Sequence, residues 1–148
     1  MVTKEFLIKN RKAFFNYEII DKYIAGLVLL GTEIKSIRNG SITLKNSFCV
    51  IENDELFVKG MHISEYSFGN LNNHEPDRVR KLLLGNKEIN QIKKKVFEKN
   101  LSIVPTKLFV NDRGFAKIEI GLGKGKKTHD KREDIKKRDI ERNIRDNY

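Results

Sequence analysis

The sequence has a single cysteine and only three histidines among its 148 residues. One cysteine excludes a disulfide framework, and together with scattered histidines it excludes a structural zinc site. Cys49 lies in the apolar run Phe48-Cys49-Val50-Ile51, a setting that predicts a buried core thiol.

Long apolar runs are also missing. No stretch approaches the roughly 18–20 residues that a membrane-spanning helix needs. The first residues, Met-Val-Thr-Lys-Glu, lack the apolar centre of a secretory signal. We therefore predict a cytoplasmic protein that does not cross a membrane.

No catalytic or metal-binding constellation is recognisable. His62, His74 and His129 are widely separated and form no H-E-x-x-H pairing. The glycine-rich segment 121–127 departs from the G-x-x-x-x-G-K-[S/T] phosphate-binding pattern, and we interpret it as a flexible basic hinge. The sequence predicts no catalytic residues, no metal and no cofactor, and hence a protein that is not an enzyme.

Positive charge is what the sequence has in excess. The formal net charge is +10, and 34% of the residues are charged. Such a balance indicates a partner rich in negative charge, either nucleic acid or an anionic membrane surface. Nucleic acid is favoured, because no apolar run is long enough to span a bilayer and the first residues do not form a secretory signal.

The basic residues fall into groups along the chain. Each group alone is typical of a solvated surface, but several groups bordering one small domain favour contacts to phosphates. Tyr17, Tyr23, Phe57 and Tyr66 are aromatic candidates for stacking on bases, although core packing is the better prediction for any one of them. The groups are Asn10, Arg11 and Lys12; Lys35 and Arg38; Arg78, Arg80 and Lys81; and Lys124, Lys126 and Lys127.

The first half of the chain reads mainly as strands. Residues 13–30 predict a strand, a turn and a second strand. A short helix should follow, capped by Thr32 and ended by Asn39-Gly40, with Lys35 and Arg38 on its outer face. Residues 47–52 and 56–62 predict two strands joined by a turn at 53–54, and residues 64–77 predict a long exposed loop.

The second half adds one clear helix and a hairpin. Residues 78–84 are ambiguous between strand and helix. Asn86 is the predicted cap of a helix over 87–99 whose buried stripe is Ile89, Ile92 and Val96. Residues 101–120 predict a hairpin turning at 111–114. About six short strands and two or three helices without βαβ alternation predict a mainly β fold, a small antiparallel barrel.

Composition changes after residue 122, so we expect a domain over 1–122 and a tail over 123–148. The tail has too few apolar residues to offset the entropy of ordering it, which predicts disorder in the free protein. Acid-first pairs four residues apart also bias it toward a helix: Glu133 with Lys137, Asp134 with Arg138, and Glu141 with Arg145. We expect the tail to become helical on a partner.

Four segments together resemble the SmpB (small protein B) family, the partner of transfer-messenger RNA (tmRNA, SsrA) in bacterial ribosome rescue. They occur in the family's order and span nearly the whole chain. They are residues 10–13 (NRKA), 25–38 (AGLVLLGTEIKSIR), 78–84 (RVRKLLL) followed by Glu88-Ile89, and 121–132 (GLGKGKKTHDKR). One departure is Ile24, where many members of the family carry an acidic residue.

The resemblance implies a barrel of the oligonucleotide-binding (OB) type that holds the tRNA-like domain of tmRNA. It implies a tail that occupies the empty mRNA channel of a stalled ribosome and imitates codon–anticodon pairing at the decoding centre. Implied partners are tmRNA, small-subunit ribosomal RNA and, during delivery, elongation factor Tu; we expect a monomer.

The resemblance assigns Asn10, Lys12 and Leu83 to tmRNA binding. We add Arg11, Lys35, Arg38, Arg80, Lys81 and Lys124 to this set from their charge or position. For the decoding centre, the resemblance and the adjoining charges select Gly125, Lys126, Lys127, His129, Asp130, Lys131 and Arg132.

Two other functions remain open on the sequence. One is a general RNA binder of the cold-shock or ribosomal-protein kind, which selectivity for the tRNA-like domain of tmRNA would exclude. The other is a nuclease or RNA-modifying enzyme that uses His129 and Asp130, which turnover of the RNA would reveal.

Overall fold

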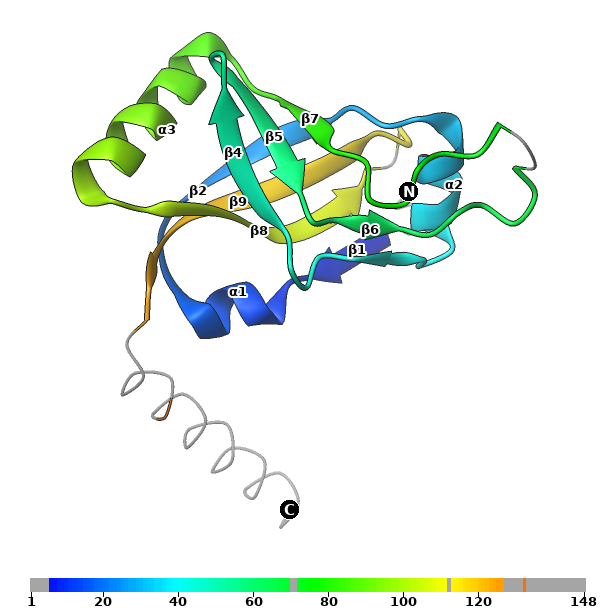
Figure 1. Cartoon of the computed structure of the whole chain (residues 1–148), viewed down its shortest axis with the longest axis horizontal. Helices are drawn as coiled ribbons and strands as arrows, with labels where there is room; N and C mark the ends of the chain where they lie inside the picture. Colours follow the sequence, from blue (N-terminus) through cyan, green and yellow to red (C-terminus); the bar gives the residue numbers. More distant parts are fainter. Residues whose placement is uncertain (1–5, 70–71, 112, 127–131, 133–148) are drawn as a thin grey trace.

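A computed structural model describes residues 6–69, 72–111, 113–126 and 132. Its elements, in chain order, are β1 (Phe6–Lys9), α1 (Arg11–Asn16), β2 (Tyr17–Leu27), α2 (Gly31–Arg38), β3 (Ile42–Thr43), β4 (Phe48–Glu52), β5 (Glu55–Lys59), β6 (His62–Ile63), β7 (Arg80–Leu83), α3 (Asn86–Lys99), β8 (Ser102–Val110) and β9 (Ala116–Gly125) (Figure 1).

Six strands form a closed antiparallel ring. The order is β8-β4-β5-β7-β2-β9, and β9 pairs back to β8. β1 adds to the outer edge of β8, while β3 and β6 make a separate two-stranded sheet. The ring leaves its six strands without a long free edge. The predicted mainly β fold with an antiparallel barrel is confirmed.

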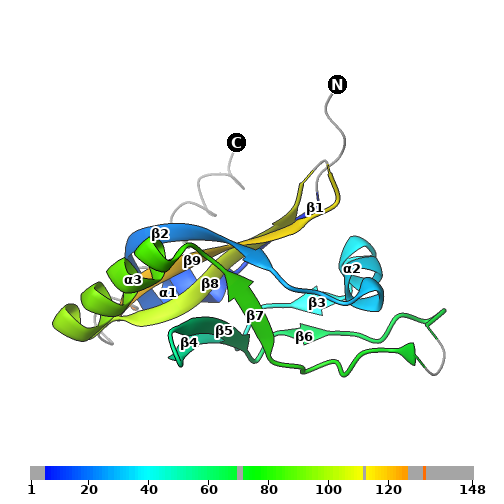
Figure 2. The same cartoon turned by 90° about the horizontal axis from the view of Figure 1, so that it is seen from above.

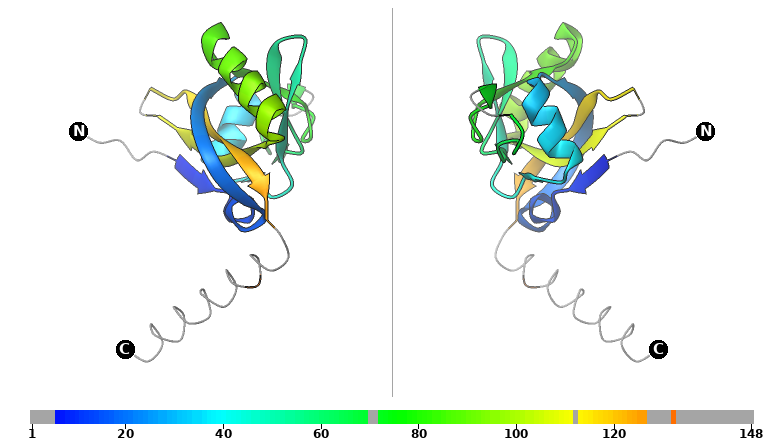
Figure 3. Two further views of the ribbon diagram at one scale, coloured as in Figure 1. Left: turned by 90° about the vertical axis from the view of Figure 1, so that its left-hand side faces the viewer. Right: turned by 90° about the vertical axis from the view of Figure 1, so that its right-hand side faces the viewer.

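The core fills the ring, and helices lie at its ends. Ile118, Ile120 and Leu122 of β9 are wholly buried and face Leu108 and Ile103 of β8. α3 lies across one end and contributes Ile92, whereas α2 lies at the other and contributes Ile37 (Figures 2 and 3). Cys49 is buried, as predicted, and burial raises the pKa of its thiol.

Residues 13–30 do not form two strands joined by a turn. They begin in α1 and continue as the single eleven-residue strand β2. Asn10 holds α1 in place: its backbone N–H donates to the carbonyl of Thr106, and its side-chain amide donates to the carbonyls of Leu44 and Pro105 at 3.2 and 2.8 Å. These partners are far away in the sequence, so local pattern could not reveal them.

The expected hinge at 121–127 is wrong over residues 121–125, which belong to strand β9. Glycine is needed here because side chains from neighbouring strands pack against the backbone. A Cβ at Gly121 would lie 2.9 Å from Ile19, and one at Gly123 would lie 2.8 Å from the Cβ of Tyr17. Just beyond the strand pairs, the Lys126 N–H donates to the carbonyl of Asn16, at the end of α1, at 2.9 Å.

The helix boundaries agree with prediction better than the caps do. α2 ends at Asn39 and Gly40, as predicted, but Thr32 is not its N-cap: Glu33 accepts the Leu30 N–H at 2.7 Å instead. Asn86 is the first residue of α3, and no side chain caps that helix. The predicted stripe is confirmed, with Ile89 and Ile92 buried and Val96 half-buried.

Two other segments depart from expectation. The strand predicted over 56–62 stops at Lys59, because Gly60 has a φ of +76° and its backbone lies against that of Asn46; His62 then pairs in β6. The loop at 64–77 is not exposed throughout, since His74 is buried. The ambiguous segment 78–84 contains strand β7, and the hairpin predicted over 101–120 is formed by β8 and β9.

Candidate nucleic-acid interface

The outer face of β2 is set by a β-bulge. Ile19 pairs with Gly123, but Asp21 pairs with Leu122, so the register shifts by one residue between them. Residues paired in antiparallel strands point to the same face. The shift therefore turns Lys22, Ile24 and Gly26 outward, on the side of the sheet opposite to the core.

An apolar strip crosses this outer face. Ile24 on β2 and Leu83 on β7 expose 56% and 55% of their surface, so two large aliphatic side chains face solvent on the same side of the sheet. Between them Gly26, which pairs with Leu83, has no side chain. The result is an exposed apolar surface that can pack against a ribose or a base.

Lysines border this strip. Lys117 pairs with Gly26, and Lys22 lies 5.4 Å from the ring centroid of Phe14 on α1, within cation–π range. Lys81 lies two residues before Leu83 on the same face of β7, with its Nζ 3.3 Å from Glu55 in an exposed ion pair. We call Lys22, Ile24, Gly26, Leu83, Lys81 and Lys117 the barrel face. Lysines at the border of such a face are able to pair with phosphates.

α1 adds cations at one end of β2. Arg11 and Lys12 are exposed, and Lys12 Nζ lies 3.3 Å from Oδ1 of Asn46. Asn10, in contrast, is 6% exposed, and its amide donates to two carbonyls. The structure therefore gives Asn10 a positioning role, since it fixes the helix that presents Arg11 and Lys12.

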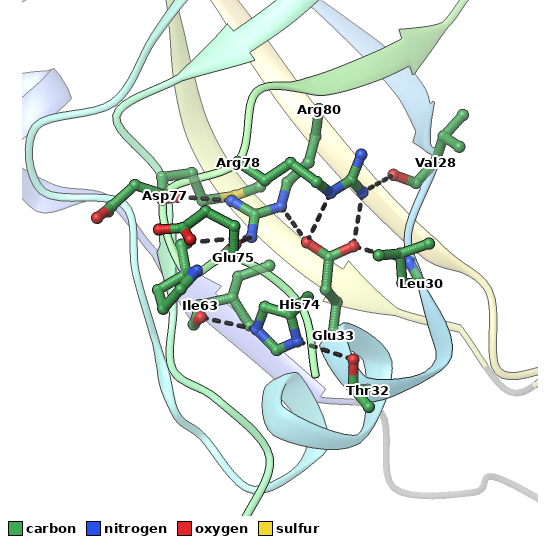
Figure 4. A network of polar contacts seen from close by, with 12 residues as sticks. Val28, Leu30, Thr32, Glu33, Ile63, His74, Glu75, Asp77, Arg78 and Arg80 are labelled. Atoms are coloured by element: carbon green, nitrogen blue, oxygen red, sulfur yellow. Dashed lines mark hydrogen bonds and ion pairs between the residues drawn. The ribbon is translucent and has the colours of Figure 1, made fainter. Parts of the chain in front are cut away.

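A buried ion network anchors α2 to the barrel (Figure 4). Both oxygens of Glu33 are engaged: Arg80 Nε donates at 2.5 Å and Arg78 Nη2 at 2.6 Å. Arg80 also donates to the carbonyls of Met61 and Pro76 at 2.7 and 3.1 Å. Burial alone would raise the pKa of the Glu33 carboxyl, but the hydrogen bonds from Arg78, the Leu30 N–H and Arg80 outweigh it and lower the pKa.

This network corrects the predicted role of Arg80. Its side chain is fully buried and bonded to Glu33 and to backbone carbonyls, so it cannot reach RNA in this structure. The cause is strand alternation: within β7 Arg80 and Leu82 point inward, whereas Lys81 and Leu83 point outward.

A buried histidine extends the network toward the loop after β6. His74 Nε2 donates to the carbonyl of Ile63 at 2.8 Å, and its Nδ1 lies 2.8 Å from the hydroxyl of Thr32 (Figure 4). Thr32 thus ties the start of α2 to this loop. The two predicted cations of α2, Lys35 and Arg38, are exposed at the surface.

The residues predicted for the decoding centre are only partly described. Gly125 is exposed at the end of β9, next to Lys124 of the predicted tmRNA-binding set, and Lys126 follows. Arg132 is exposed and helical. Lys127, His129, Asp130 and Lys131 lie outside the described residues, as does most of the segment predicted to fold on a partner.

The aromatic side chains that are most exposed are not the ones predicted to stack on bases. Tyr17, Tyr23, Phe57 and Tyr66 are all half-buried, and Lys95 of α3 engages Tyr23 and Asp21. Sequence reasoning missed Phe14 and Phe68, which expose 43% and 77% of their surface. For Phe68 the sequence carries a signal, because Phe68 and Tyr66 are aromatic residues in an otherwise polar segment.

Within the described ranges, no set of three or more histidine, cysteine or acidic side chains is arranged to hold a metal ion. No helix in the same part of the chain is long and apolar enough to cross a bilayer.

A pocket of about 490 Å³ between β4 and β8 is lined mainly by apolar side chains, with Tyr17 and Ser102.

Comparison with known proteins gives consistent matches. The family model described as SmpB protein matches residues 7–148. The SsrA-binding proteins of Christiangramia forsetii and Thermosipho melanesiensis are 53% and 52% identical over 137 residues, covering 93% of this chain and 87% and 93% of theirs.

A solved structure extends this likeness to three dimensions. One chain described as "tmRNA-SmpB: a journey to the center of the bacterial ribosome" superposes with a TM-score of 0.70 at 41% identity, over 83% of this chain and 86% of that one. Sequence and architecture therefore agree, and the chain belongs to the SmpB family.

Proposed function

We propose that this chain binds the tRNA-like domain of tmRNA and delivers it to stalled ribosomes in trans-translation. The observation that carries the proposal is the barrel face, where exposed Ile24 and Leu83 are bordered by Lys22, Lys81 and Lys117. Lysines bind phosphates without regard to sequence, while the flat apolar strip favours a particular RNA shape. The names of the SsrA-binding relatives support tmRNA as that RNA.

The RNA-contacting set follows from exposure. Leu83, Lys81, Arg11 and Lys12 contact tmRNA, with Lys35, Arg38 and Lys124 at the margins, whereas Asn10 acts by positioning α1. Gly125, Lys126, Lys127, His129, Asp130, Lys131 and Arg132 form the decoding-centre segment. The tail occupies the empty mRNA channel and imitates codon–anticodon pairing, with small-subunit ribosomal RNA as its partner.

The remaining features of the proposal concern the cell and the complex. The protein acts in the cytoplasm as a monomer, and elongation factor Tu accompanies tmRNA during delivery. It is not an enzyme, so prolonged incubation with pure tmRNA leaves the RNA intact; turnover of the RNA would contradict this.

Selectivity tests the proposal most simply. At physiological salt, the tRNA-like domain should outcompete unrelated RNA hairpins of the same length for the full chain, in a competition titration followed by fluorescence anisotropy. Equal affinity for all hairpins would identify a general RNA binder instead.

A truncation separates the tasks of barrel and tail. We place the cut after Lys126, because its N–H donates to the carbonyl of Asn16 and so still belongs to the folded barrel. This variant should bind the tRNA-like domain as the full chain does but fail to support peptide tagging on stalled ribosomes. Tagging by the truncated protein would refute the division.

A further inference from the structure

An aromatic pair of half-buried Tyr66 and exposed Phe68 lies beside α2, in the loop that follows β6. The rings of Tyr66 and Phe68 meet edge to face, with centroids 5.5 Å apart and planes at 66°. Phe68 exposes 77% of its surface, more than any large apolar side chain of the described residues except Phe97. The pair adds little to the core and leaves a π-face open to solvent.

Cations accompany this pair. Lys35 Nζ lies 5.5 Å from the ring centroid of Tyr66. Arg38 is three residues further along α2 and so shares the face of Lys35, and its guanidinium lies against Gly114 in the β8–β9 turn. Among the described residues, neither Lys35 nor Arg38 forms an ion pair with a carboxylate. Both charges are available to an outside anion.

The pair is held in place rather than loosely attached. The side chain of Asn73 accepts the Tyr66 N–H at 3.0 Å and donates to the Tyr66 carbonyl at 2.6 Å. The next residue, His74, is bonded to Thr32 of α2 and to the Ile63 carbonyl. A rigid support lowers the entropy lost when a ligand stacks on these rings.

The position connects the pair with the barrel face. β2 leads from Gly26 directly to α2, and the Val28 N–H donates to the carbonyl of Lys81 at 3.0 Å. An RNA lying on the barrel face can therefore continue toward this end of the barrel. Exposed Glu65 and Glu75 flank the pair in the same loop, so an extended phosphate backbone fits poorly there, whereas one stacked base fits.

We propose that Tyr66 and Phe68 form a stacking platform for one unpaired base of the bound RNA, while Lys35 and Arg38 pair with a phosphate next to that base. The proposal rests on the proposed function, since the RNA is the tRNA-like domain of tmRNA. It adds a second contact site, at the α2 end, to the barrel face.

The test compares two exposed phenylalanines in the full chain. Phe68→Leu removes the π-face of the platform, and Phe97→Leu makes the same change on α3, at the other end of the barrel, where Phe97 is 88% exposed. Base–aromatic stacking predicts that Phe68→Leu binds the tRNA-like domain about 5- to 100-fold more weakly, with an unchanged salt slope. Phe68→Tyr keeps an aromatic ring and should bind as wild type. Phe97→Leu should also bind as wild type.

A second variant tests the phosphate contact. Lys35→Gln should make the log–log salt slope of binding shallower by about 0.7–0.9, the change expected for one lost phosphate. Equal affinities for Phe68→Leu, Phe97→Leu and wild type would overturn the platform while leaving the proposed function intact. Weakened ribosome binding by Phe68→Leu with unchanged affinity for the RNA would also overturn it. A wild-type chain without preference for the tRNA-like domain would overturn both proposals.

Discussion

Arg80 and Lys81 are neighbours in the sequence, yet the fold uses their charges in opposite ways. Arg80 is buried, and its charge is balanced by Glu33 at the α2 end of the barrel. Lys81 points outward on the barrel face and makes only an exposed pair with Glu55. The difference separates a cation that holds the fold together from a cation that faces solvent and that we propose contacts RNA, and it arises from the alternation of a single strand.

Removing the buried anion should have the largest effect on stability. Glu33→Gln leaves the guanidinium of Arg80 buried opposite a neutral amide, so we expect the free energy of unfolding to fall by about 3–5 kcal/mol. Urea unfolding followed by circular dichroism measures this. Glu55→Gln, which breaks the exposed pair with Lys81, is the matched control and should change stability by about 0–1 kcal/mol. Equal losses of unfolding free energy in the two variants would contradict the distinction between Arg80 and Lys81.

The same carboxylate should shape the acid limb of stability. The pKa of Glu33 is lowered in the folded chain, so its stabilising contribution is complete above the unfolded value of about 4.3 and is lost as pH falls through the lower folded value. Wild type should therefore lose stability below about pH 4 more steeply than Glu33→Gln does. Parallel curves of unfolding free energy against pH for the two proteins would show that the pKa of Glu33 is not lowered by folding.

Two glycines of β9 sharpen the contrast between covered and open parts of the barrel. A Cβ at Gly123 would lie 2.8 Å from the Cβ of Tyr17, whereas a Cβ at Gly125 would have no atom within 4 Å. Gly123→Ala should therefore destabilise the protein by about 1–3 kcal/mol, and Gly125→Ala by less than about 0.5 kcal/mol. Thermal unfolding of the two variants measures this difference. If Gly123→Ala has the stability of wild type, Tyr17 moves aside without cost and the close packing does not constrain position 123.

Substituting an exposed cation should have the reverse result: it should weaken RNA binding and change the free energy of unfolding little. Lys22→Gln should weaken binding of every RNA by a similar factor and make the log–log salt slope shallower by about 0.7–0.9. Lys94→Gln, at an exposed position of α3, is the matched control and should leave the slope unchanged. If both variants change the slope equally, the RNA does not select the barrel face.

Local patterns predicted the elements whose signals lie within a few residues. The amphipathic stripe of α3 and the β8–β9 hairpin are of this kind, as are the turn at Asn53-Asp54 and the end of α2 at Gly40. Antiparallel closure also followed from the strand count without βαβ alternation. The barrel could thus be predicted from local patterns, whereas the register of its strands could not.

What sequence could not supply depends on distant partners. α1 is held by Asn10, which bonds to residues near positions 44 and 105, and the glycines of β9 make sense only beside Tyr17 and Ile19. Charge counting likewise could not distinguish Arg80 from Lys81, because Glu33 lies 47 positions away. For the candidate site, the sequence shows where basic residues are grouped, but the grouping does not predict which of their side chains are exposed.

Leu83→Asp gives the most direct test of the barrel face as the RNA-binding surface. The side chain is 55% exposed, so the substitution should leave the melting temperature nearly unchanged. A carboxylate between Lys81 and Lys117 should repel phosphate, and we expect the affinity for the tRNA-like domain to fall about 10-fold or more. Phe97→Asp on α3 should bind as wild type. If Leu83→Asp binds the RNA as tightly as Phe97→Asp does, the barrel face does not hold the RNA.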